Sequence, residues 1–90
     1  TKGFEYRVEV AHRVLEPGVR VAVVDDFLSR GRTAEALGEI AEEAGCTVVC
    51  CGFALEKAYE PGRSRLESHG WPVQAVVRLG RPANGVVDLL

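Results

Sequence analysis

The strongest constraint on the fold is a pair of short apolar runs, one on each side of an amphipathic segment. The first run, VRVAVVDD, begins at Val19 and has continuous apolar residues at positions 21–24. The second run covers residues 47–55. Runs this short and rich in β-branched residues are typical of strands covered on both faces. The sequence therefore predicts two buried strands joined by a crossover.

The segment between these runs has the pattern of a helix. Thr33 is the predicted N-cap, and Gly45 is the predicted C-terminal stop. Glutamates occupy the intervening polar positions, while the apolar residues recur at helical spacing. Strand, helix and strand together predict a right-handed βαβ unit. The predicted buried face of the helix consists of Leu37, Ile40, Ala41 and Ala44.

The flanking segments extend the same α/β pattern. Residues 4–14 alternate apolar and polar side chains, as a half-exposed strand does, and a turn is predicted at 16–18. Glu60-Pro61-Gly62 opens a short amphipathic turn or helix that runs through Leu66 and stops at Gly70, and residues 72–79 predict a third parallel strand. Residues 80–90 form a tail with a turn at Asn84-Gly85. The predicted fold class is α/β with a parallel sheet.

Length and charge narrow the class of protein. Ninety residues allow one small domain, and the net charge of −2 gives no bulk attraction to a nucleic acid. No apolar run has the roughly 18 residues that cross a membrane. The chain begins at Thr1 and contains no methionine, which indicates a segment of a longer protein. We therefore expect a cytoplasmic protein of which these residues are one part.

Cysteine and histidine offer no clear metal site in the sequence. The three cysteines fall in one apolar stretch and lack the spacing of metal ligands. We therefore expect buried thiols in a reduced compartment. The two histidines are far apart in the sequence, and we expect ordinary structural or surface roles for them. These residues are Cys46, Cys50, Cys51, His12 and His69.

The loop after the first buried strand carries the chemistry. An open parallel sheet binds ligands at the carboxyl ends of its strands, which directs attention to the residues after Val24. The adjacent carboxylates of Asp25 and Asp26 repel one another and need hydroxyl groups or a cation nearby. A stretch of small and basic residues then leads into the helix, where free backbone N–H groups favour an anion. Carboxylates can accept hydrogen bonds from the diol of a sugar, and backbone amides can donate to a phosphate. The two kinds of group side by side therefore suit a ribose 5-phosphate.

A plainer interpretation is available for the same residues. Asp25, Asp26 and Thr33 can act as helix caps, and Arg30 and Arg32 can lie in solvent. Helix capping does not explain why two adjacent aspartates stand at the end of a buried strand. We therefore favour the interpretation of these residues as a binding site.

Other phosphate-binding and acidic folds fit the sequence poorly. The chain has neither G-x-x-x-x-G-K-[ST] nor G-x-G-x-x-G after a strand, which excludes a P-loop and disfavours a dinucleotide fold. A response-regulator receiver domain also ends its first strand in paired acids. That fold needs a phosphoacceptor aspartate after a later strand, and here the corresponding residues are Ala54-Leu55-Glu56.

The segment VVDDFLSRGRTA resembles the PRPP-binding motif of type I phosphoribosyltransferases. The resemblance is best to the xanthine-directed members, through Asp-Asp-Phe-Leu at the loop, Ala44-Gly45, Glu56-Lys57 and residues 65–79. It covers nearly the whole chain up to Leu79. It implies that residues 1–90 are the C-terminal half of one phosphoribosyltransferase domain, with 80–90 as its tail.

The resemblance also implies roles for individual residues. Asp25 and Asp26 would hold the ribose 2′- and 3′-hydroxyls of PRPP, near the positive charge that develops at C1′. Lys57 would contact an exocyclic oxygen of the purine, and Phe27 would stack on the base. Lys2 stands where the family's mobile loop closes over pyrophosphate. The 5-phosphate would be cradled by Ser29, Arg30, Gly31, Arg32 and Thr33, of which the two arginines replace the commoner threonine and glycine.

The implied reaction transfers phosphoribose from PRPP, bound with Mg²⁺, to a 6-oxopurine, with xanthine as the expected base. The products are a nucleoside 5′-monophosphate and pyrophosphate, in purine salvage. A homodimer is expected, and the resemblance implies no direct protein ligand for the metal. The alternative is a regulator of the same fold that binds PRPP as a signal and acts on transcription through a separate DNA-binding domain. The Glu56-Lys57 pair favours the enzyme, because a regulator needs no contact with a base.

Overall fold

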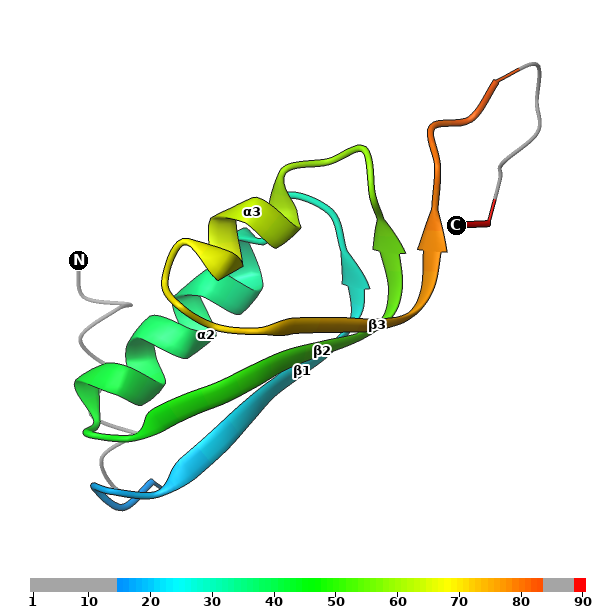
Figure 1. Cartoon of the computed structure of the whole chain (residues 1–90). Coiled ribbons are helices and arrows are strands. Elements are labelled where there is room, and N and C mark those ends of the chain that lie inside the picture. Colours follow the sequence, from blue (N-terminus) through cyan, green and yellow to red (C-terminus); the bar gives the residue numbers. More distant parts are fainter. Residues whose placement is uncertain (1–14, 84–88) are drawn as a thin grey trace.

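The computed structural model describes residues 15–83 and 89–90 and shows a parallel sheet with helices between its strands. The strand order is β1-β2-β3, and both pairs of neighbours are parallel (Figure 1). The α/β class and the three strands are therefore as predicted. The elements are β1 Arg20–Leu28, α2 Arg32–Glu43, β2 Thr47–Lys57, α3 Gly62–Glu67 and β3 Val73–Leu79.

Several sequence predictions lie outside the described residues. These concern the strand over residues 4–14, the side chains of Lys2 and His12, and the turn at Asn84-Gly85. The turn at 16–18 is confirmed, because the backbone N–H of Val19 donates to the carbonyl oxygen of Glu16 at 3.2 Å.

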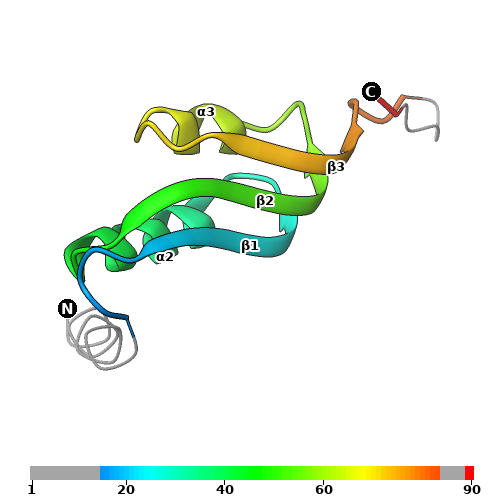
Figure 2. The same ribbon diagram turned by 60° about the horizontal axis from the view of Figure 1, so that its bottom comes forward.

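Only one face of the sheet is covered within the described residues. Figure 2 shows α2 and α3 on the same side of the three strands. Val23 and Cys51 point into this layer and are buried, whereas Val24 and Val76 on the other face are 73% and 85% exposed. The prediction of strands covered on both faces is therefore wrong for these residues. The continuous apolar run reflects one packed face and one bare apolar face.

The packed face of α2 differs from the predicted one at one position. Ile40, Ala41 and Ala44 are buried as predicted, but Leu37 is 46% exposed. Gly38 takes the inward position, and a Cβ there would lie 2.3 Å from the ring of Trp71. The indole of Trp71 therefore packs where a contact of Leu37 was expected. The indole fits there because position 38 has no side chain.

The ends of α2 are set by glycines rather than by a hydroxyl. Gly31 is the N-cap, in the left-handed conformation with φ of 79°, and no side chain caps the helix. The predicted cap, Thr33, lies inside the first turn instead. At the other end Gly45 follows the last turn with φ of 87°, which confirms it as the stop.

The cysteines are free, as expected. Cys46 and Cys51 are buried and Cys50 is half-buried. Burial, together with the neighbouring Cys50, raises the pKa of the Cys51 thiol. These thiols therefore pack as small apolar groups. Among the described residues, neither helix combines the length and apolar character that crossing a membrane requires.

Candidate functional site

A pocket of about 300 Å³ lies where the chain leaves β1 and enters α2. This is the carboxyl end of a parallel strand, the position at which such sheets bind ligands. The predicted loop forms most of its wall. The lining residues are Asp25, Phe27, Leu28, Ser29, Arg30, Gly31, Arg32, Thr33, Ala34 and Phe53.

The loop is held in place by α3. The backbone N–H of Gly62 donates to the carbonyl oxygen of Ser29 at 2.9 Å. The Nε of Arg65 donates to the carbonyl oxygen of Arg30 at 2.8 Å. Both of these loop carbonyls are therefore engaged by α3, which fixes the orientation of the peptide groups between β1 and α2.

The backbone donors of the same loop are unused within the described residues. The N–H groups of residues 30–34 meet no acceptor there, and the first intrahelical bond is made by Glu35 to the carbonyl of Gly31, at 2.9 Å. Free N–H groups at the start of a helix carry a partial positive charge and bind anions. The loop thus has the donor arrangement that a phosphate needs.

Gly31 is required by packing as well as by backbone conformation. A Cβ at this position would lie 3.0 Å from both the Cα and the carbonyl oxygen of Gly62. Its φ of 79° is itself unfavourable for other residues. The contact between the two glycines lets α3 approach the loop, and Gly31 is therefore needed even without a ligand.

The two aspartates lie within β1 and do not cap α2. The Oδ1 of Asp25 accepts from the backbone N–H of Asp26 at 2.8 Å, and the Oδ1 of Asp26 accepts from that of Phe27 at 3.0 Å. The interpretation of these residues as helix caps is therefore wrong. Asp25 is half-buried and lines the pocket, while Asp26 is exposed and lies outside its lining.

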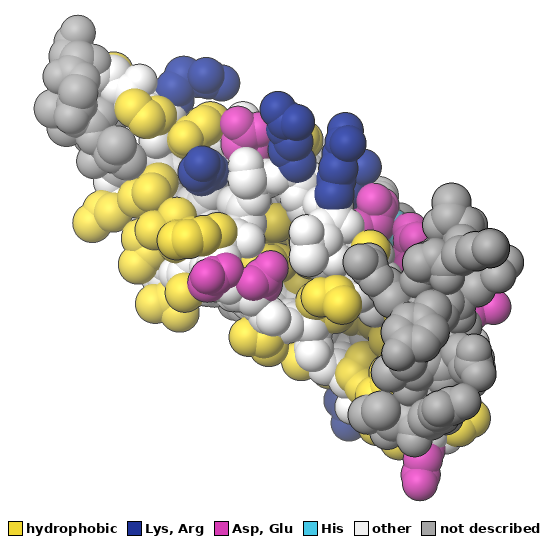
Figure 3. Space-filling model, turned by 180° about the vertical axis from the view of Figure 1, so that it is seen from behind, with side chains coloured by type: hydrophobic (Ala, Val, Ile, Leu, Met, Phe, Trp, Pro, Cys, Tyr) yellow, Lys and Arg dark blue, Asp and Glu magenta, His cyan; other side chains and the backbone are white. Residues whose placement is uncertain are grey.

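The basic and aromatic residues are placed for contact with a ligand. Phe27 lines the pocket although 61% of its surface is exposed. Arg30 and Arg32 are exposed, and neither is paired with a carboxylate of the described residues. Figure 3 shows Lys and Arg side chains along one edge of the molecule, beside acidic and hydrophobic side chains.

The structure does not bring every predicted site residue together. Lys57 is the last residue of β2 and is exposed, but it does not line the pocket. In the ladder Glu56 pairs with Leu28, so Lys57 follows directly at the same edge of the sheet. Lys2 lies outside the described residues.

Glu56 has a role that the sequence analysis missed. Its side chain is 1% exposed and accepts from the Nη2 of Arg63 at 2.8 Å and the Nε of Arg78 at 3.1 Å. The Arg63 hydrogen bond is the main reason that the pKa of the Glu56 carboxyl is lowered. Arg63 also donates to the carbonyl of Val73 at 3.0 Å. The sequence does contain a signal for this role, which is a carboxylate within an apolar strand. A buried carboxylate needs a cationic partner, so such a residue predicts an ion pair.

The comparison of sequences finds phosphoribosyltransferases. The chain is 41% identical over 87 residues to xanthine phosphoribosyltransferase of Streptococcus pneumoniae (strain Hungary19A-6). The match covers 97% of this chain and 45% of that protein. The chain therefore spans about half the length of the curated relatives it matches. No protein-family model matches the chain.

The comparison of structures finds proteins of the same class. An adenine phosphoribosyltransferase from Rhodothermus marinus matches with a TM-score of 0.70 and 43% identity, over 76% of this chain and 38% of its own. The Saccharomyces cerevisiae adenine phosphoribosyltransferase, complexed with an imino-altritol bisphosphate and adenine, matches with a TM-score of 0.63 and 31% identity. That match covers 69% of this chain and 34% of its own.

Sequence and fold thus agree with the loop geometry. The sequence match runs through nearly the whole chain, and the two structural matches cover 76% and 69% of it. In sequence the chain is similar to one part of a xanthine phosphoribosyltransferase, and its α/β sheet corresponds to part of the type I phosphoribosyltransferase fold.

Proposed function

We propose that this chain supplies the PRPP-binding half of a purine phosphoribosyltransferase. The observation that carries the proposal is the loop of residues 30–34, whose N–H groups are unused within the described residues. The loop forms one pocket with the half-buried carboxylate of Asp25. Phosphate and a sugar diol need these two kinds of group, a few ångströms apart.

In this proposal the loop binds the 5-phosphate, and Ser29 and Thr33 add hydroxyl donors to its amides. Asp25 and Asp26 receive the ribose hydroxyls. Their negative charge stabilises the positive charge that develops at C1′ as pyrophosphate leaves. PRPP enters with Mg²⁺ as part of the substrate, and we assign no protein ligand to that ion.

The proposed base is a 6-oxopurine, with xanthine preferred. An ammonium group only donates hydrogen bonds, so Lys57 suits an oxo group and opposes a 6-amino group. A site of this kind rejects the unmatched base by a factor that can reach roughly 10⁴. The named relatives include both xanthine and adenine phosphoribosyltransferases, so the choice of base needs its own test.

The test is turnover of isotope-labelled PRPP with each purine in turn, using the longest natural chain that contains these residues. We expect xanthine, guanine or hypoxanthine to be converted to its nucleotide and adenine to be refused. Lys57→Ala should raise the KM for the oxopurine more than the KM for PRPP. Adenine as the best substrate would overturn the choice of base. Binding of PRPP without turnover of any purine would instead favour the regulator.

A further inference from the structure

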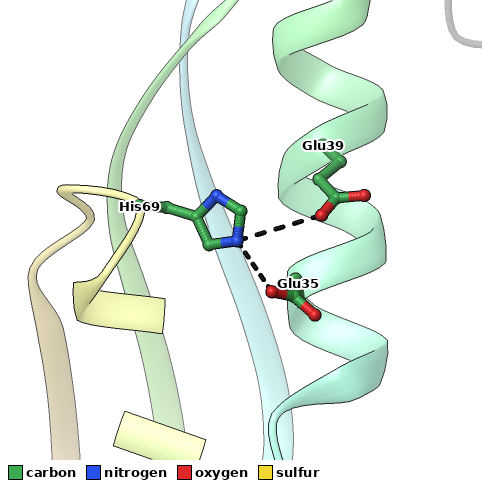
Figure 4. Close-up of side chains that lie close together, drawn as sticks. All are labelled: Glu35, Glu39 and His69. Atoms are coloured by element: carbon green, nitrogen blue, oxygen red, sulfur yellow. Dashed lines mark hydrogen bonds and ion pairs between the residues drawn. The ribbon is translucent and has the colours of Figure 1, made fainter. Parts of the chain in front are cut away.

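A second cluster of ligating side chains lies outside the candidate PRPP pocket. Glu35 and Glu39 stand one turn apart on α2, and His69 faces them from the turn after α3 (Figure 4). The Nε2 of His69 is 2.8 Å from Oε2 of Glu35 and 3.8 Å from Oε1 of Glu39. One ligand atom from each residue lies within 4.8 Å of the others.

These separations suit a small tetrahedral cation. Ligand atoms about 2.0–2.2 Å from a zinc ion at tetrahedral angles are roughly 3.3–3.6 Å apart. The two distances from His69, 2.8 and 3.8 Å, lie on either side of that range. Side-chain rotations that move Glu35 away from His69 and bring Glu39 closer would therefore bring these two distances to the range that a zinc ion requires.

The imidazole is held in position by an aromatic neighbour. Its ring stacks on Trp71 with 4.2 Å between centroids and 12° between planes. Trp71 is itself fixed, because its Nε1 donates to Oε2 of Glu42 at 3.0 Å. A ligand fixed in this way loses little conformational freedom when it binds a metal.

The carboxylates also gain from a cation at this place. Like charges one helical turn apart repel each other, so Glu35 and Glu39 disfavour their own arrangement. The Nη1 of Arg65 lies 3.4 Å from Oε1 of Glu35, which leaves Oε2 directed toward His69. Such a second partner orients a ligating carboxylate in metal sites.

We propose that Glu35, Glu39 and His69 form a binding site for a divalent transition-metal ion, with Zn²⁺ as the preferred occupant. One imidazole nitrogen and two carboxylates are ligands that zinc accepts, and the half-exposed position leaves the fourth place to water. Ca²⁺ and Mg²⁺ prefer sites built from oxygen alone, so they should compete poorly. This site is separate from the Mg²⁺ that enters with PRPP.

The test is calorimetric titration of the purified chain with Zn²⁺, with Glu39→Gln as the main variant. Glu39 is exposed, so its substitution leaves the fold intact. Glu43→Gln is the matched control, because it removes the same charge from the same helix outside the cluster. Loss of an outer partner already weakens metal binding by about 10–100-fold, so loss of a ligand should weaken it at least tenfold. His69→Gln should do the same.

The free cysteines need a separate readout, because thiolates also bind zinc. Co²⁺ bound to sulfur gives an intense charge-transfer band, whereas Co²⁺ bound to nitrogen and oxygen gives only weak visible bands. We expect the weak bands, lost in Glu39→Gln and kept in Glu43→Gln. A thiolate band, equal affinities in both variants or no binding of Zn²⁺ would each overturn the proposal. These readouts do not depend on phosphoribosyl transfer.

Discussion

Two corners at the carboxyl edge of the sheet treat their charged groups in opposite ways. At the first, which we call the loop corner, residues 29–33 present amides and arginines that find no acceptor or carboxylate among the described residues. At the second, the clamp corner, Glu56, Arg63 and Arg78 satisfy one another. The clamp corner joins β2, α3 and β3. The loop corner is hydrogen-bonded to the same helix, α3.

This difference in partners distinguishes charged groups that stabilise the fold from groups that are available to bind a ligand. A buried carboxylate is tolerable only when its partners are present, so the clamp corner has its charges committed to the fold. Amides at a helix start that lack internal partners remain available to a ligand. Charged residues in a sequence look alike in both places, and only the partners distinguish them.

The largest expected effect is on stability at the clamp corner. Glu56→Gln removes the buried carboxylate that pairs with Arg63 and Arg78, and it leaves Arg63 only the exposed Glu67, at 3.6 Å. Such a loss typically costs about 3–5 kcal/mol. Urea denaturation at neutral pH measures it, with Arg32→Gln at the loop corner as the control. Equal losses for the two variants would break the distinction between the corners.

The next effect is on activity, without loss of stability. Asp25→Asn or Asp26→Asn removes fixed negative charge from the loop corner, and kcat should fall by about 10²-fold or more. Neither carboxylate caps α2, so folding should survive. Steady-state kinetics with PRPP, alongside the same urea denaturation, checks both parts. Unchanged kcat in both variants would show that neither aspartate takes part in the reaction.

Acid should weaken the clamp corner more gradually. The hydrogen bond from Arg63 lowers the folded-state pKa of Glu56 below its unfolded value. The resulting stability is complete above the unfolded pKa, and it is lost as the pH falls through the folded pKa. Denaturation midpoints measured from neutral pH to about pH 3 should therefore fall less in Glu56→Gln than in the native chain. A parallel fall in both would show that other carboxylates dominate.

The sequence predicts the frame better than it predicts the contacts. Strands, helices and the binding loop follow from periodicity and from glycine positions, which are local properties. The inward face of Gly38 and the pairing of Glu56 depend on Trp71 and Arg78, which lie far away in the sequence. Single-sequence patterns carry no record of such partners. Thr33 is the predicted cap because hydroxyl residues favour that position, whereas Gly31 takes it in a left-handed conformation and packs against the distant Gly62.

The smallest effect concerns Arg65, which connects α3 to the loop corner. Its Nε donates to the carbonyl of Arg30, and its Nη1 approaches Glu35. Arg65→Met removes both contacts, whereas Arg65→Lys keeps one cation that can reach a single partner. One hydrogen bond contributes about 0.5–1.5 kcal/mol, so the Kd for PRPP should rise by roughly 2- to 12-fold in Arg65→Met.

Calorimetry with PRPP measures this rise in Kd. Comparison of the two variants distinguishes its two possible causes. If α3 positions the loop through the Arg30 carbonyl, the lysine variant should recover part of the affinity, with kcat nearly unchanged in both. If Arg65 acts only through the charge it adds near the phosphate, lysine should recover all of it. Native affinity in Arg65→Met would show that the Gly62 contact alone holds the loop, because that bond from N–H to the Ser29 carbonyl is backbone and survives the substitution.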